Sequence, residues 1–320
     1  MSVDEAMLRS LGTFSDPSLG ITERFEILQL SSGWTVGVLS APLGEAQPVG
    51  WLICHSFGSE QWHLHATEVA LARALAAKGF PVLRFHCQGY GDSEQTDFAP
   101  TVTSHLADTP EAAAHLRSLT GVGEIGLIGA RFGAAVARLT AADVGAGYLV
   151  LVDPLVRGRR YLRQLLRSRA IVELTNDGAT EESRPDDPAS DLHAVLRSGG
   201  VVNVRGFAVT PSLYEAMNAI DLTQAAPWGG SALVIQVSRG PRPDPSLTEL
   251  GSRLEVSGAT VASTIVSGQY AAIFGDGHFR PVEGDELADA LVDVNGEIAD
   301  AVVRWAGERV DGPTNEGGNK

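Results

Sequence analysis

The feature that most constrains the fold is an alternation of short apolar runs with helix-like segments, which extends from about residue 24 to residue 153. The apolar runs are rich in Val, Leu and Ile, as is typical of strands buried on both faces. The segments between them are rich in Ala and Leu, and several are followed by glycine, a frequent helix stop. This repetition predicts an α/β fold with a mostly parallel sheet covered by helices on both faces.

The pattern predicts about eight strands. We expect them at Glu26–Leu30, Trp34–Leu39, Val49–Cys54, Phe80–Phe85, Glu124–Gly129, Tyr148–Asp153, Ser231–Val237 and Thr260–Val266. Helices are expected at Thr67–Lys78, Ser104–Leu119 and Gly133–Asp143, and a last helix from about Glu286 or Asn295 to Trp305. The second helix is expected to break at Thr109–Pro110, because proline disrupts a helix interior.

Residues 154–230 interrupt the alternation and divide the core into an N-terminal half, 1–153, and a C-terminal half, 231–310. Arginines between positions 157 and 169 alternate with leucines at helical spacing. They predict either a solvated amphipathic helix or a basic rim for an anionic ligand. Residues 176–191 are polar and turn-rich, which predicts a mobile loop, and the tail 311–320 is expected to be disordered.

Charge and composition exclude several classes of protein. With 24 basic and 39 acidic residues, the net charge of −15 argues against a nucleic-acid binder and against a polybasic membrane-surface protein. No apolar run is long enough to span a membrane, and no secretory signal is visible. The two cysteines, Cys54 and Cys87, make neither a disulfide framework nor a zinc spacing. We therefore expect a cytoplasmic protein without a metal or cofactor.

Three short motifs follow predicted strands. Leu52–Glu60 reads Leu-Ile-Cys-His-Ser-Phe-Gly-Ser-Glu, Arg84–Glu94 contains Gly-Tyr-Gly-Asp-Ser, and Ile128–Ala135 reads Ile-Gly-Ala-Arg-Phe-Gly-Ala-Ala. In order and spacing they resemble three motifs of the α/β-hydrolase fold. The resemblance extends over about residues 24–306. The resemblance implies an oxyanion-hole loop in the first motif, a nucleophile elbow, Gly-x-Ser-x-Gly, in the third, and a lid at 154–230. Within the family, a chain with arginine in the third motif resembles the hydrolase-like proteins associated with exosortase systems.

The third motif departs from the family pattern at the position of the nucleophile, which Arg131 occupies. A guanidinium stays protonated and cannot attack a carbonyl, so the resemblance does not carry the usual acyl-enzyme chemistry. One hypothesis is an anion pocket, in which Arg131 acts together with backbone N–H groups at Phe132 and in the loop His55, Ser56 and Phe57. The other hypothesis is that Arg131 folds back and pairs with a local carboxylate such as Asp153. The sequence does not decide between these two hypotheses.

The resemblance also implies positions for the other two members of a triad. The acid is Asp244, after the strand at 231–237, or Asp153, which otherwise is a turn residue before Pro154. The base is His278 in Gly-Asp-Gly-His-Phe, although a surface histidine fits this position equally well. If His278 and an acid are in place, they could act as a general base on a bound water or a substrate proton.

Other reactive side chains also have purely structural interpretations. His55 is expected to be mainly structural, and Cys54 and Cys87 to be buried apolar filler. Ser56 replaces a glycine and is a weak candidate nucleophile. His63 and His65 could chelate a metal only from a strand, which the pattern does not predict there.

Two alternative functions are the main candidates. The first is a non-hydrolytic protein that binds an anionic or acyl small molecule, with or without non-covalent acid–base chemistry, in a biosynthetic pathway. The second is a true ester, thioester or amide hydrolase with a non-standard nucleophile or a His-activated water. Protein scaffolding is a third candidate, and a homodimer is the candidate oligomer.

Overall fold

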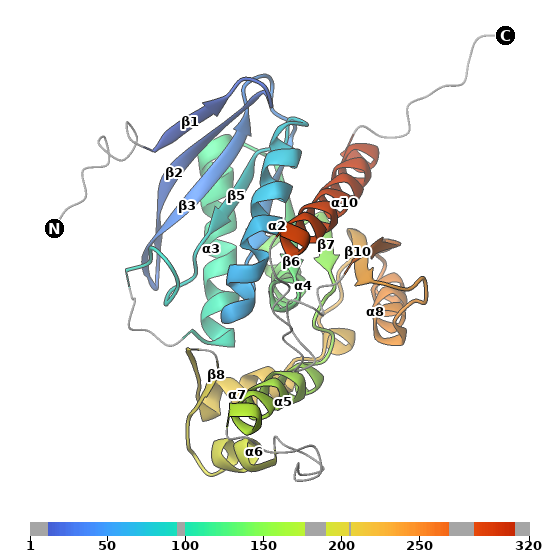
Figure 1. The fold of residues 1–320 in the computed structure, drawn as a ribbon. Helices are drawn as coiled ribbons and strands as arrows, with labels where there is room; N and C mark the ends of the chain where they lie inside the picture. Colours follow the sequence, from blue (N-terminus) through green and yellow to red (C-terminus); the bar gives the residue numbers. More distant parts are fainter. Residues whose placement is uncertain (1–11, 95–99, 177–189, 205, 269–284, 311–320) are drawn as a thin grey trace.

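The computed structural model describes residues 12–94, 100–176, 190–204, 206–268 and 285–310. The strands of its main sheet are β1 Thr13–Asp16, β2 Ile21–Leu30, β3 Gly33–Pro42, β4 Val49–Cys54, β5 Val82–Phe85, β6 Glu124–Ala130, β7 Tyr148–Val152, β10 Ser231–Ser238 and β11 Thr260–Ser267. The sheet has nine strands in the order β1-β2-β3-β5-β4-β6-β7-β10-β11 (Figure 1). Pairing is antiparallel from β1 to β5 and parallel from β5 to β11.

The helices that flank the sheet are α2 Ser59–Ala76, α3 Val102–Thr120, α4 Phe132–Val144, α8 Pro245–Val256 and α10 Asp285–Val310. Two separate hydrophobic clusters show that they cover opposite faces. Residues of α2 and α10, such as Leu71 and Val302, pack on one side with Trp51 of β4. Residues of α3, α4 and α8, such as Leu116 and Leu250, belong to the cluster on the other side. The predicted α/β architecture is therefore confirmed.

The main sheet has one strand more than the about eight expected, because β1 was not predicted. Its sequence, Thr-Phe-Ser-Asp, is short and mostly exposed, so it carries little strand signal. Helix α2 begins at Ser59 instead of Thr67, directly after Gly58, whose φ is 60°. The early turns contain Gln61, Trp62 and two histidines, which give no strong helical pattern in the sequence.

The expected break at Pro110 is absent, since α3 runs through it without interruption. The helix is fixed at both ends, by a capping box between Thr101 and Ser104 and by Gly121 in the left-handed conformation. Ala112, Ala113 and Leu116, beyond the proline, are fully buried. Packing and capping outweigh the one helical hydrogen bond that the proline cannot make.

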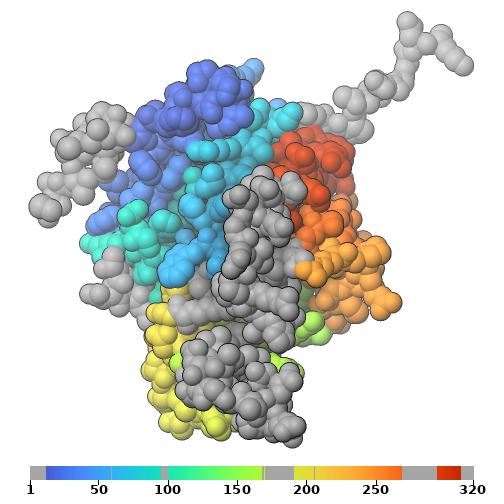
Figure 2. Space-filling view, viewed as in Figure 1, coloured from blue at the N-terminus to red at the C-terminus, as the bar shows by residue number. Residues whose placement is uncertain are grey.

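The inserted segment 154–230 lies between β7 and β10 and contains α5 Gly158–Asn176, α6 Ser190–Arg197, strands β8 Val202–Val204 and β9 Phe207–Val209, α7 Pro211–Ala219 and a short helix Leu222–Gln224. It was expected to be helical, and the β8–β9 hairpin corrects this. Figures 1 and 2 show it projecting at one end of the molecule.

Helix α5 has the amphipathic pattern of a solvated helix. Leu162 and Leu166 are buried, whereas Arg163 and Arg167 are exposed. The loop at 176–191 falls almost entirely outside the described residues, and the tail 311–320 does so completely. In the part of the chain that the structure describes, no helix combines the length and apolar character needed to cross a bilayer.

Backbone-to-backbone packing holds β6, α4 and β4 together. A Cβ atom at Gly129 would overlap the backbone of Gly133, and one at Gly133 would overlap the carbonyl oxygen of Cys54. Strand β6, the turn after it and the first turn of α4 therefore have a fixed position relative to the end of β4.

Gly133→Ala is expected to lower the free energy of unfolding by at least about 3 kcal/mol, because the overlapping atoms belong to the backbone and cannot move aside. Chemical denaturation measures the effect. Gly123→Ala is the matched control, since a Cβ there meets no atom within 4 Å. A similar loss of stability in both variants would contradict this account.

Candidate functional site

The turn between β6 and α4 holds Arg131 in an unusual backbone conformation, with φ 54° and ψ −116°. Positive φ is costly for a residue with a side chain and persists where the surroundings enforce it. Here the Arg131 N–H donates to the carbonyl of Val152 (2.9 Å), and the Leu155 N–H donates to the carbonyl of Arg131 (3.1 Å). The neighbouring Asp153 also has positive φ, 42°. These two strained residues end adjacent parallel strands at the carboxyl edge of the sheet.

The guanidinium of Arg131 lies between two carboxylates. Its Nη1 donates to Asp153 Oδ2 (2.9 Å), and its Nε is 3.5 Å from Glu60 Oε1. The Ser56 hydroxyl donates to the other oxygen of Glu60 (3.0 Å). The ring of Tyr161, from α5, has its centroid 6.0 Å from the guanidinium carbon. We call Ser56, Glu60, Arg131, Asp153 and Tyr161 the elbow cluster.

Burial and charge act in opposite directions on the groups of this cluster. Burial alone would lower the pKa of Arg131, but the charges of Glu60 and Asp153 outweigh it and raise that pKa. Burial raises the pKa of Glu60 above its usual range, although the charge of Arg131 and the Ser56 hydroxyl favour the carboxylate. Burial and the nearby Glu60 also raise the pKa of the Tyr161 phenol. Arg131 is thus a permanent cation that cannot serve as a nucleophile or a base.

Of the two arrangements considered for Arg131, the structure shows the pairing with Asp153. The guanidinium nevertheless reaches a cavity of about 220 Å³ between the sheet edge, α5 and the start of α8. The cavity is lined by Arg131, Asp153, Pro154, Leu155, Val156, Arg157, Arg160, Tyr161, Gln164, Asp244, Ser246 and Leu247. Both acid candidates, Asp153 and Asp244, therefore share one cavity with Arg131.

Asp244 also has a structural role, since it caps the N-terminus of α8. Its carboxylate accepts a hydrogen bond from the Ser246 N–H (2.7 Å) and lies 3.9 Å from Arg160 Nη1. Burial opposes its ionisation, but the hydrogen bonds from Ser246 and the charge of Arg160 lower its pKa. The base candidate, His278, lies outside the described residues, so its role stays a prediction.

The loop after β4 is held by buried contacts. His55 Nε2 accepts a hydrogen bond from the Cys87 N–H (2.9 Å), which leaves the proton on Nδ1 to donate to the Ser56 carbonyl (2.9 Å). Burial, with the nearby His105 and His86, lowers the pKa of His55 well below its usual value. These contacts agree with a structural role for His55.

Aromatic rings pack around the same loop. The ring of Phe57 lies against that of Phe132 of α4, with centroids 5.8 Å apart, and against that of Phe207 from the inserted hairpin at 6.3 Å. Phe207 also contacts Trp62 at 5.7 Å and Tyr90 at 6.0 Å. The inserted segment therefore covers the loop that the resemblance assigns to the oxyanion hole.

The buried thiols lie nearby but are not activated. Burial raises the pKa of Cys54 to about 12 and that of Cys87 above its usual range. Ligand atoms of His55, Cys87 and His105 lie within 4.8 Å of one another and form a candidate metal group. Both ring nitrogens of His55 already make hydrogen bonds, so metal binding there would require breaking one of them.

Sequence reasoning missed Glu60 and Tyr161. Glu60 stands in the first turn of α2, whose early start was not predicted, and Tyr161 belongs to the inserted segment. One signal was available: an enclosed arginine needs carboxylates around it, and Glu60 stands three residues after Phe57.

Arg131→Leu is expected to destabilise the protein by about 3–5 kcal/mol at about pH 8, because Glu60 and Asp153 then lose their shared cation. Loss of the cation raises the folded-state pKa of Glu60 further. The destabilisation from this raised pKa is absent below the usual carboxyl pKa, because Glu60 is then protonated in both the folded and the unfolded protein. Urea unfolding should therefore show a much smaller difference from wild type at about pH 4. Adding Glu60→Gln should recover part of the loss, and a difference that does not change with pH would contradict the ion-pair account.

Comparisons with known proteins bear on the fold. No family model matches the chain and no curated protein matches it. Among solved structures, Est1E from Butyrivibrio proteoclasticus is 16% identical, with a TM-score of 0.54, over 88% of this chain and 99% of that one. DcsB, solved in complex with its substrate analogue, is 17% identical, with a TM-score of 0.56, over 91% and 100%.

A third structure, an esterase from Pyrobaculum calidifontis, is 18% identical, with a TM-score of 0.52, over 89% of this chain and 86% of that one. At these identities the likeness concerns the fold alone. It agrees with the mostly parallel sheet covered by helices on both faces. The chain therefore has the α/β-hydrolase fold.

Proposed function

We propose that this protein is a non-hydrolytic member of its fold, which binds a small anionic or acyl molecule in the cavity beside Arg131. One observation carries the proposal: a permanently charged guanidinium stands in the strained turn where the resemblance places a serine nucleophile. The surrounding carboxylates hold it protonated. Chemistry in this cavity is then non-covalent, and Arg131 contributes charge and orientation.

The lining of the cavity supports an anionic ligand. Three arginines, Arg131, Arg157 and Arg160, face two carboxylates, Asp153 and Asp244. Arg160 is the most available, because its side chain is 65% exposed and its contact with Asp244 is 3.9 Å long. A ligand carboxylate or phosphate at Arg160 would add to the Arg131–Asp153 pair without displacing it. Leu155, Val156 and Leu247 offer an apolar wall for an acyl chain.

A true hydrolase is the second candidate, and one contact favours it. The Ser56 hydroxyl donates to Glu60, a buried carboxylate whose pKa is raised by burial, so a base lies beside a hydroxyl. The charge of Arg131, 3.5 Å from that carboxylate, works against the transfer of a proton to it. Four further points stay predictions: general-base chemistry by His278, a role in a biosynthetic pathway, a homodimer and a cytoplasmic location. The resemblance to proteins associated with exosortase systems stays untested as well.

Labelling with a fluorophosphonate probe separates the two candidates. We expect no adduct on the wild-type protein, because none of the described residues that line the cavity is an activated nucleophile. A double variant, Arg131→Ser with Glu60→Gln, restores the family residue at the elbow without leaving Glu60 unpaired. An adduct at position 131 of this variant would show that a working base and oxyanion hole remain. An adduct on wild-type Ser56 or Cys54, mapped by mass spectrometry, would establish the hydrolase instead.

Binding of anions is tested separately. Millimolar acetate or inorganic phosphate should raise the melting temperature of the wild-type protein by about 2 °C, because a ligand that binds only the folded state stabilises it. Arg160→Gln should abolish the shift. Arg163→Gln is the matched control, since Arg163 lies on the same helix but is exposed and does not line the cavity. Equal shifts in both variants would indicate a non-specific salt effect.

A further inference from the structure

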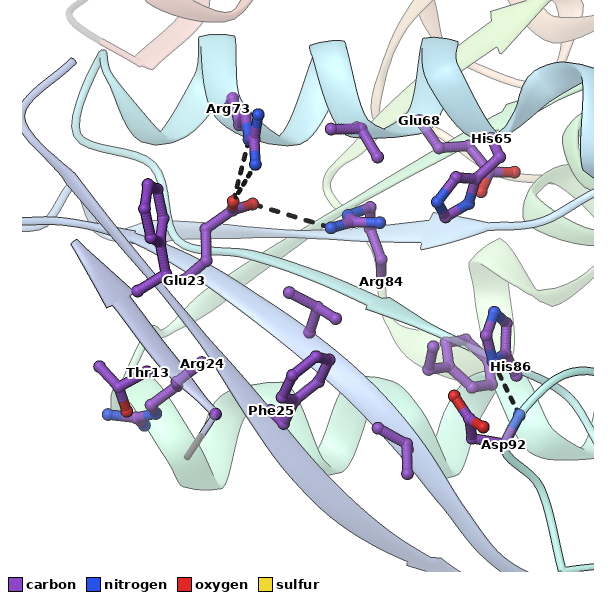
Figure 3. A pocket seen from close by; sticks show the side chains of 16 residues that line it. Thr13, Glu23, Arg24, Phe25, His65, Glu68, Arg73, Arg84, His86 and Asp92 are labelled. Atoms are coloured by element: carbon purple, nitrogen blue, oxygen red, sulfur yellow. Dashed lines mark hydrogen bonds and ion pairs between the residues drawn. The ribbon is translucent and has the colours of Figure 1, made fainter. Parts of the chain in front are cut away.

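A second cavity, of about 760 Å³, lies between α2 and the strands β1, β2, β3 and β5 (Figure 3). It shares no lining residue with the cavity beside Arg131. Its walls differ sharply in character. One carries ionisable side chains from α2 and β5 together with Glu23 of β2, and the other carries aromatic and aliphatic side chains from β1, β2 and β3.

The polar wall contains two largely buried ionisable groups, Arg84 and Glu68. Arg84 is largely buried, with a side chain only 13% exposed, and its ion pair with Glu23 is 3.7 Å long. The Nε of Arg84 is buried and has no hydrogen-bond partner among the described residues. Glu68 is only 7% exposed, and the charge of Arg84 favours its ionised form.

The charges on this wall do not balance. Arg73 and Arg84 approach the single carboxylate of Glu23 from two sides, as Figure 3 shows, with Arg73 at 2.6 Å. Among these three groups one positive charge is in excess, and the carboxylate of Asp92 lines the cavity as well. Glu68 could offset this excess charge, but burial raises the pKa of Glu68 to about 8, against the pull of Arg84. At neutral pH Glu68 is mostly protonated and offers an O–H donor beside the cation.

The apolar wall is large and partly open. Val36 and Val38 line it from β3, and Phe25 lines it from β2. Phe25 and Phe14 are 48% and 56% exposed, which is unusual for aromatic side chains on strands. Aromatic surface of this kind, beside a few convergent polar groups, is typical of a small-molecule site.

We propose that this cavity is a second ligand site, which binds a monocarboxylate with an apolar chain or ring. The carboxylate accepts hydrogen bonds from Arg84 and Glu68, and the apolar part lies on Phe25 and Val38. A single negative charge matches the excess positive charge that Arg73 and Arg84 have over Glu23. A phosphate dianion would exceed it and would meet Glu23 and Asp92, which also line the cavity. The site is independent of the function proposed for Arg131.

Octanoate is a suitable probe, and octanol is its neutral counterpart. Isothermal titration of the full-length chain near pH 7 should show octanoate binding at least about tenfold more tightly than octanol, because charge-assisted hydrogen bonds act on the carboxylate alone. Equal binding of the two, or no binding of octanoate, would overturn the proposal.

Four variants locate the binding. Arg84→Gln should weaken octanoate binding by about tenfold or more, and Val38→Trp should abolish it by filling the cavity. Glu68→Gln should bind within about twofold of wild type, because the amide keeps a donor in place of the protonated carboxyl. Arg24→Gln is the matched control, since Arg24 lines the same cavity but pairs with Glu26.

Circular dichroism and thermal unfolding show that each variant is folded before it is titrated. Unchanged binding by folded Arg84→Gln or folded Val38→Trp would overturn the assignment. So would a loss in Arg24→Gln as large as that in Arg84→Gln. If Arg84→Gln fails to fold because Glu23 loses a partner, Val38→Trp and the comparison with octanol decide the matter alone.

Discussion

The structure around the carboxyl edge of the sheet depends on one charge, the largely enclosed guanidinium of Arg131. Arg131 cannot lose its proton, and its backbone conformation places its side chain at the ends of β6 and β7. A cation in that position requires carboxylates close by, and Glu60 and Asp153 provide them from two other segments. The early start of α2, the strained end of β7 and the first turns of α5 meet at this group. The ion pairs join three segments of the core, and the ring of Tyr161 links this group to the inserted segment.

The glycines around the turn explain why the backbone keeps its shape without a serine. Gly129 and Gly133 permit contact among β6, α4 and the end of β4 that any side chain would prevent. The geometry of the turn is therefore a property of the packing and not of the residue at position 131. Helix α2 connects the two candidate sites, since Glu60 in its first turn contacts Arg131 and Glu68, further along, lines the second cavity.

Much of the fold was predictable because its strands are continuous apolar runs. Val49–Cys54 appears with the predicted bounds, and the strands beside it differ by only one or two residues. The errors occur where tertiary contacts override local signals. Capping and burial carry α3 through Pro110, and the exposed β1 has too little pattern to be recognised. These are the usual limits of reasoning from periodicity alone.

The candidate site was less predictable than the fold. The motifs identified Arg131 and offered Asp153 as its partner, which the structure pairs at 2.9 Å. Glu60 could not be assigned, because its distance from Arg131 depends on how α2 crosses the sheet. The second cavity had no sequence signal of its own. His65 attracted attention beside His63, but the cavity also requires Arg84 and Glu68, which look ordinary in the sequence.

The contact between Glu60 and Arg131 has a consequence for the history of such sequences. A chain with serine at position 131 and glutamate at position 60 would bury a carboxylate without its cation, and a chain with arginine but no glutamate would leave the cation with Asp153 alone. Each single exchange passes through a poorly stable intermediate. Positions 60 and 131 are therefore expected to covary among natural relatives, with both residues exchanged or both retained.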